Sequence, residues 1–208
     1  MAKRIITISR QFGSGGRTIA KSVAEKLGYK YYDKEIIEKV SEMTGFDPKY
    51  IEENGEYAPG KSIFSLAGSF ISSSRSMGGM SAYDYLWVMQ RNAIIEIADE
   101  GDCVIVGRCA DYILRDRPDA MHVFIHAPME SRAERIVKRY GESDKKPFER
   151  LKEKDSKRSV NYKHFTGETW GDARNYDLCL NSDKLTIRKC VEVICDFATM
   201  DWGTGKQV

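Results

Sequence analysis

The chain has 208 residues, of which 41% are hydrophobic, enough for one α/β domain with a sizeable core. Its 33 basic and 31 acidic residues leave a net charge of only +2, so the charge balance favours neither a nucleic-acid partner nor a membrane surface. The N-terminus enters a strand-like run directly, and no apolar run approaches the roughly 20 residues of a membrane span. We therefore expect neither a signal peptide nor a membrane anchor.

The cysteines are odd in number, and no pair has C-x-x-C spacing, which favours reduced thiols in a cytoplasmic protein. They are Cys103, Cys109, Cys179, Cys190 and Cys195. His122 and His126 lie in a strand-like run without further ligands nearby, so we expect no metal pair there.

The N-terminal segment passes from a β-rich apolar run through a glycine-rich turn into a helical pattern. We predict a buried strand over residues 4–9 and a helix over 16–27. This order is typical of a phosphate cradle, because glycines let the backbone approach an anion while N–H groups and the helix N-terminus attract it. The candidate phosphate-binding residues of the turn are Gly13, Ser14, Gly15, Gly16, Arg17 and Thr18.

Residues 11–18 match the phosphate-loop pattern G-x-x-x-x-G-K-[ST] in part. Gln11 stands in place of the first glycine, and Gly16 stands at the second. Arg17 replaces the lysine, which keeps the charge but exchanges a point ammonium for a planar fork. Thr18 stands at the position whose hydroxyl binds magnesium.

Two other interpretations of this turn stay open. A dinucleotide fingerprint G-x-G-x-x-G fits Gly13 and Gly15, with Asp33 at a suitable distance downstream. It places Thr18 where a third glycine is needed for close helix–strand packing. The other alternative is a plain turn without a ligand.

The next segment is expected to contribute to substrate binding. We predict a short strand over residues 29–32 that ends at Asp33, followed by a helix over 34–43. From its position alone, Asp33 is a candidate cap for that helix. Residues 45–80, rich in glycine and serine, form either a mobile surface insertion or a substrate lid or clamp.

A second polar cluster follows a buried strand. After a helix over 83–99, residues 103–107 form the unbroken apolar run typical of the centre of a parallel sheet. Arg108 and Asp111 follow at the carboxyl end, the edge at which open α/β sheets bind ligands. Alternatively, Arg108 belongs to a structural ion pair and Asp111 pairs with Arg115.

The C-terminal half is rich in basic residues. Arg132 and Arg139 lie seven residues apart on one face of a predicted helix. Residues 141–167 are dense in charge, as expected for a solvated face or for a basic lid that closes over phosphates. The elements predicted in this half are a strand over 121–125, a helix over 130–140, a strand over 176–180, a helix over 185–200 and a tail over 201–208.

Strands and helices alternate along the chain, which indicates a parallel α/β sheet. Four short motifs in the correct order resemble the nucleoside monophosphate kinases, and among them the cytidylate kinase-like family. The motifs are Ile8-Ser-Arg-Gln-Phe-Gly-Ser-Gly-Gly-Arg-Thr-Ile-Ala20, Val106-Gly107-Arg108 with Asp111, Asp155-Ser156-Lys157-Arg158, and Leu180-Asn181-Ser182. The resemblance implies a three-layer P-loop kinase fold, with a five-stranded parallel sheet between helices and a single domain over 1–208. Segment 45–80 would then be the acceptor-binding insertion and 141–167 the lid.

The resemblance also implies transfer of the ATP γ-phosphoryl group to a nucleoside monophosphate, usually CMP or dCMP, with Mg²⁺. Phosphoryl transfer needs in-line positioning, magnesium and cations around the spreading negative charge, and no catalytic base is required when the acceptor is a phosphate oxygen. The implied ATP-binding residues are Gly13 to Thr18, with Thr18 on the magnesium. The implied acceptor residues are Asp33, Arg108 and Asp111, and the implied catalytic arginines are Arg17, Arg132, Arg139 and Arg158.

Departures from the family pattern keep other functions open. Arg17 in place of lysine favours a nucleotide-binding regulatory module that no longer transfers phosphate. The unusual segment 45–80 favours a kinase with a non-nucleotide acceptor. Cys109 and Ala110 separate Arg108 from Asp111, whereas typical bacterial cytidylate kinases have the aspartate directly after the arginine. Arg10 is a further hypothesis, since it precedes the glycine-rich turn and could reach the phosphates.

Overall fold

The computed structural model describes residues 2–56 and 79–202, and over these residues it contains one five-stranded sheet. All strand pairs are parallel, in the order β2-β3-β1-β4-β5, which confirms the predicted sheet. The strands are β1 (Ile5–Arg10), β2 (Lys30–Tyr32), β3 (Cys103–Val106), β4 (Ala120–His126) and β5 (Leu178–Asn181).

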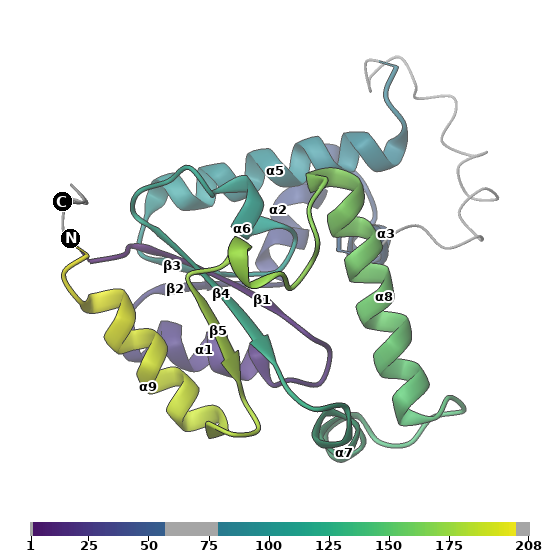
Figure 1. The fold of residues 1–208 in the computed structure, drawn as a ribbon. Helices are drawn as coiled ribbons and strands as arrows, with labels where there is room; N and C mark the ends of the chain where they lie inside the picture. Colours follow the sequence, from purple (N-terminus) through teal and green to yellow (C-terminus); the bar gives the residue numbers. More distant parts are fainter. Residues whose placement is uncertain (1, 57–78, 203–208) are drawn as a thin grey trace.

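Helices cover both faces of the sheet, with α1 and α9 on one side and α2 and α5 on the other (Figure 1). The pair α7 and α8 extends beyond the sheet, past the end of β4. The helices are α1 (Gly16–Leu27), α2 (Glu35–Thr44), α3 (Pro48–Asn54), α5 (Ala82–Glu100), α6 (Ala110–Ile113), α7 (Met129–Tyr140), α8 (Pro147–Thr166) and α9 (Thr186–Thr199), with a 3-10 turn η2 (Ala173–Asn175). No helix in the described ranges has the length and apolar character that crossing a bilayer requires.

The two faces of β1 carry different side chains. Ile6 and Ile8 are fully buried against α1 and α9, and Ile5 packs with α2 and α5 on the opposite face. Thr7 and Ser9 share that opposite face by strand alternation, so it becomes polar toward the carboxyl end of the strand. A third small apolar cluster joins α7 to α8.

Two predicted segments differ from expectation in their local structure. Segment 45–80 begins with α3, where Asp47 caps the helix by accepting from the N–H groups of Lys49 and Tyr50, and Pro48 occupies the first helical position. Residues 57–78 of this segment lie outside the described residues. Most of segment 141–167 is the single 20-residue helix α8, which also begins with a proline.

The strand order places the glycine-rich turn at a topological switch point. β1 pairs with β3 on one side and with β4 on the other. Connections from these neighbouring strands therefore leave the sheet in different directions, which opens a crevice at the carboxyl ends of the strands. The turn after β1 and the turn after β3 both border this crevice.

Candidate active site

The turn between β1 and α1 has the conformation of an anion-binding loop. Gly13 and Gly15 adopt left-handed φ angles of 79° and 83°. At Gly13 a side chain would also meet the carbonyl oxygen of Arg132 at 2.9 Å. Left-handed residues in such a turn bring backbone N–H groups to one concave side, where they bind anions.

Helix α7 and the turn after β5 hold this loop by its carbonyl groups. Arg132 Nη1 donates to Phe12 O at 3.2 Å, and Arg135 Nη1 donates to Gly13 O at 2.8 Å. Ser182 Oγ donates to the carbonyl of Ser14 at 2.6 Å. The oxygens that would repel a phosphate are thereby bound to other groups.

A pocket of about 680 Å³ opens beside the loop. Among the residues that the structure describes, nine arginine and lysine side chains line it, against three carboxylates. The cations are Arg10, Arg17, Lys49, Arg108, Arg135, Arg139, Lys154, Lys157 and Arg158, and the carboxylates are Glu52, Glu53 and Glu56. Such an excess of positive charge in a concave site attracts a ligand with several negative charges, such as a polyphosphate.

Most of the predicted site residues meet at this pocket, although they come from distant parts of the chain. Gly13, Gly15, Gly16, Arg17, Thr18, Arg108, Arg139 and Arg158 line it. Within the described ranges, its lining does not include Ser14, Asp33, Asp111 or Arg132.

Ser14 and Arg132 support the loop from behind. The Ser14 side chain is buried, and its hydroxyl donates to Gln11 O at 2.9 Å. Arg132, also buried, forms an ion pair with Asp155 Oδ2 at 2.5 Å, while Asp155 Oδ1 accepts from Phe12 N at 2.7 Å. Arg132 thus connects α7, α8 and the loop in this structure and does not reach into the pocket.

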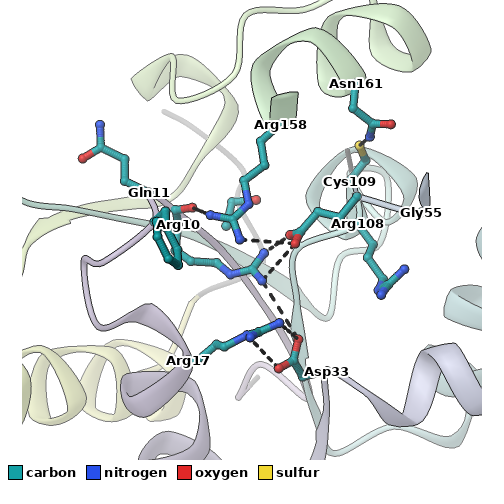
Figure 2. A network of polar contacts seen from close by, with 12 residues as sticks. Arg10, Gln11, Arg17, Asp33, Gly55, Arg108, Cys109, Arg158 and Asn161 are labelled. Carbon is teal, nitrogen blue, oxygen red and sulfur yellow. Dashed lines mark hydrogen bonds and ion pairs between the residues drawn. The ribbon is translucent and has the colours of Figure 1, made fainter. Parts of the chain in front are cut away.

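Asp33 contacts the pocket through arginine. Its carboxylate lies 2.9 Å from Arg17 Nε and 4.0 Å from Arg10 Nη2 (Figure 2). The alternative that Asp33 caps the following helix is wrong, because Lys34 is the N-cap of α2 and no side chain caps it. The carboxylate instead holds Arg17 at the base of the pocket.

Asp111 lies at a separate pocket with His122 and Tyr162. Its carboxylate is buried and accepts from Ser9 Oγ at 3.1 Å and from Tyr162 Oη at 2.8 Å. Burial raises the pKa of this carboxyl group, although both hydrogen bonds act in the opposite direction. The alternative that Asp111 pairs with Arg115 is wrong, since Arg115 lies over the ring of Tyr112 and pairs with Asp116.

Arg108 sits in an unusual turn. Gly107, Arg108 and Cys109 all have positive φ, at 72°, 57° and 55°. For each non-glycine residue such a conformation costs about 1–3 kcal/mol and persists where the surrounding structure demands it, often at functional sites. The turn buries the Arg108 guanidinium, whose Nη1 donates to Gln90 Oε1 at 2.6 Å.

The structure places Thr18, the magnesium ligand predicted from the sequence, at the pocket. It lines the pocket at the first turn of α1, and its hydroxyl accepts from Arg139 Nη1 at 2.9 Å. Over residues 2–56 and 79–202, no group of three or more His, Cys, Asp or Glu side chains could hold a metal ion. Mg²⁺ does not require such a group, because it usually keeps several waters and binds through one or two protein ligands together with substrate phosphates, so the role of Thr18 stays a prediction.

Sequence reasoning missed Glu56 and Gln90. Glu56 follows α3 and pairs with Arg10 and Arg158 inside the pocket. Gln90 is 1% exposed on the apolar stripe of α5, between Leu86 and Ala93. A polar residue on such a stripe is a usable signal, whereas Glu56 lies in no pattern that would have distinguished it. Arg10, left as a hypothesis, does line the pocket.

The fold has three layers, with one parallel sheet between two layers of helices. Together with the glycine-rich loop after the first strand and the arginine-lined pocket at the switch point, it defines a P-loop kinase. Comparison with known proteins narrows this class. The model of the cytidylate kinase-like family matches residues 5–184, and the chain belongs to this family.

Individual relatives agree with this placement. A protein of Pyrococcus horikoshii named cytidylate kinase is 27% identical over 183 residues, covering 88% of this chain and 81% of its own. A crystal structure of an uncharacterized protein from Eubacterium ventriosum is 26% identical, with a TM-score of 0.69 over 95% of this chain and 99% of that one. The shikimate kinase of Acinetobacter baumannii shares the fold, with a TM-score of 0.53 at 14% identity over 93% of this chain and 92% of that one. Family and relatives together support a nucleotide kinase, which implies ATP as the donor.

Proposed function

We propose that the protein transfers the γ-phosphoryl group of ATP to a nucleoside monophosphate, with CMP and dCMP as the acceptors of choice. The observation that carries the proposal is the joining of a phosphate-binding loop and arginines from β1, α1, the β3 turn, α7 and α8 in one pocket. Each of these groups suits a reaction that consists of positioning and charge stabilisation.

In this proposal the loop from Gly13 to Thr18 holds the ATP phosphates, and Thr18 contributes to the binding of Mg²⁺. When bound, the ion neutralises charge that develops on the transferred group. Arg17 and Arg139 are proposed to contact the phosphates, since Arg17 lies in the first turn of α1 and Arg139 donates to Thr18 in the same turn.

The acceptor end of the site is proposed around Arg108 and Arg158, with Asp33 holding Arg17 and Arg10. Residues 45–80 are proposed to form the acceptor-binding segment, and 141–167, which contains α8, the lid. Arg132 acts in this scheme through Asp155, and Asp111 through Ser9 of β1. A cytoplasmic location would supply ATP and is compatible with five unpaired thiols.

The test is an ADP-release assay with Mg²⁺ at neutral pH and a panel of CMP, dCMP, UMP, AMP and shikimate. The proposal expects turnover on CMP or dCMP well above the rate of ATP hydrolysis without acceptor. Turnover on shikimate alone would favour a kinase with a non-nucleotide acceptor. ATP binding by calorimetry without turnover on any acceptor would favour a regulatory module.

A further inference from the structure

Alternating charges connect the phosphate loop to α8 (Figure 2). Arg17 pairs with Asp33, Asp33 lies near Arg10, Arg10 pairs with Glu56, and Glu56 pairs with Arg158. The side chains of Arg10, Glu56 and Arg158 are only 4%, 10% and 6% exposed. Buried charges of this kind persist when they are paired, and here Glu56 is the anion between two arginines.

The Glu56 carboxylate is bound as a phosphate would be. Both of its oxygens accept from Arg10, one from each terminal nitrogen, with Nη2 to Oε2 at 3.2 Å. Arg158 Nη2 donates to the same Oε2 at 3.3 Å. Guanidinium groups recognise carboxylate and phosphate by the same two-nitrogen geometry, so two forks that converge on one carboxylate also suit a phosphate.

The electrostatics agree with this geometry. Burial by itself would raise the pKa of Glu56, but the nearby Arg10, Arg158 and Arg108 outweigh it and lower the pKa. The surrounding positive potential thus strongly favours an anion at this position. In the described part of the pocket lining, Glu56 is one of three carboxylates beside nine cations.

The backbone around Glu56 is held so that its carboxylate lies between these arginines. Gln90 Nε2 donates to Gly55 O at 2.9 Å, and Gln90 Oε1 accepts from Arg108. Gln90 thereby holds both the peptide group that precedes Glu56 and the guanidinium of Arg108. A side chain at Gly55 would collide with Arg108, and one at Gly107 would collide with both Arg10 and Glu56.

We propose that Glu56 determines acceptor selectivity because its carboxylate occupies the acceptor's phosphate subsite between Arg10, Arg108 and Arg158. An acceptor that carries a phosphate replaces the carboxylate and keeps the arginines paired. An acceptor that offers only hydroxyl groups cannot replace it, because the buried guanidiniums would lose their anion. The identity of the acceptor rests on the proposed function, whereas the anion subsite does not.

The test measures the binding of inorganic phosphate by calorimetry in the wild type and in Glu56→Gln. The amide has the same size but no charge, so phosphate no longer competes with a built-in anion. If Glu56 fills the subsite about nine-tenths of the time, the variant binds phosphate about 10-fold more tightly. Phosphate bound at the glycine-rich loop contributes equally to both proteins and cancels from the comparison.

Glu53→Gln is the matched control, because Glu53 is an exposed glutamate that lines the same pocket one turn earlier. The Glu53→Gln variant removes the same charge. It is expected to change the phosphate affinity less than 2-fold, because solvent and salt screen an exposed charge. If Glu56→Gln does not fold, as judged by circular dichroism, Glu56→Asp carries the test. Its shorter side chain keeps the charge but reaches the two arginines less well, so phosphate again binds more tightly than in the wild type.

Unchanged or weaker phosphate binding in the folded Glu56 variant would overturn the inference and assign Glu56 a purely structural role. Equal tightening in Glu53→Gln would overturn it too, because general charge would then explain the effect. An acceptor panel without turnover on any nucleoside monophosphate would refute the proposed function, yet the phosphate comparison would still test the subsite.

Discussion

The ion pair between Arg132 and Asp155 offers a quantitative test of how helix α8 is attached to the rest of the molecule. Asp155 accepts from Arg132 Nη1 at 2.5 Å and from Phe12 N at 2.7 Å, so one carboxylate joins α7, α8 and the phosphate loop. The side chain of Arg132 is 5% exposed and that of Asp155 is 17% exposed. The Asp155→Ala variant would leave a buried guanidinium without its carboxylate.

Removal of one partner of a buried pair costs about 3–5 kcal/mol, and the partial exposure of Asp155 places the expected loss near 3 kcal/mol. Asp155→Asn keeps an acceptor for Phe12 N and should lose about half as much, since only the charge is missing. Arg132→Met alone removes the other partner. The double variant should lose at least about 1.5 kcal/mol less free energy of unfolding than the two single variants lose in sum.

The assay is urea unfolding followed by circular dichroism at pH 7 for the wild type, the single variants and the double variant. Arg188→Ala is the control, because Arg188 is 87% exposed and pairs with Glu192 on the surface of α9. Its midpoint should match that of the wild type. Additive effects of Arg132→Met and Asp155→Ala would refute the reasoning, because independent residues do not form a tether.

Three other predictions concern the pocket and its surroundings. Arg158→Ala should reduce kcat about 10³- to 10⁵-fold if the residue stabilises the transferred group, and Arg158→Lys should restore part of the lost kcat. An unchanged kcat of Arg158→Ala in steady-state assays excludes that role. Gly107→Ala should lower the urea midpoint far more than Gly28→Ala, because both have φ +72° but only the side chain at Gly107 would meet other atoms, those of Arg10 and Glu56. Asp111→Asn tests the raised pKa of Asp111. The folded state then binds a proton more tightly than the unfolded state, so lowering the pH from 7 to 4 should stabilise the wild type relative to this variant, and parallel pH profiles of unfolding would contradict it.

The sheet and the phosphate loop were predictable because their signals are local. Residues 103–107 form an apolar run that only a central strand buries on both faces, and the glycines at 13, 15 and 16 mark a turn that other residues would strain. Helix α3 was also within reach, since Asp47 before Pro48 is a helix start, but the glycine and serine content of the longer segment hid it.

Helix α8 was harder to recognise because its buried side chains are mostly polar. Of its buried residues only Leu151 and Tyr162 are apolar or aromatic, while Arg158 and Asn161 are buried through polar contacts. A stripe defined by hydrophobicity therefore does not form. The same physics hides Glu56, whose burial depends on two arginines that are 46 and 102 residues away along the chain.

The substitution of Arg17 for the phosphate-loop lysine becomes intelligible once its neighbours are known. Arg17 binds Asp33 through Nε and Nη2, so it is held by a carboxylate while it lines the pocket. A lysine has three donors on one nitrogen, so Asp33 and a phosphate would both have to lie around that single atom. The five donors of a guanidinium permit both at once. A carboxylate also holds a second arginine of the pocket, because Glu56 pairs with Arg10. Carboxylate-held arginines are thus the means by which this pocket keeps many positive charges close together before an anion arrives.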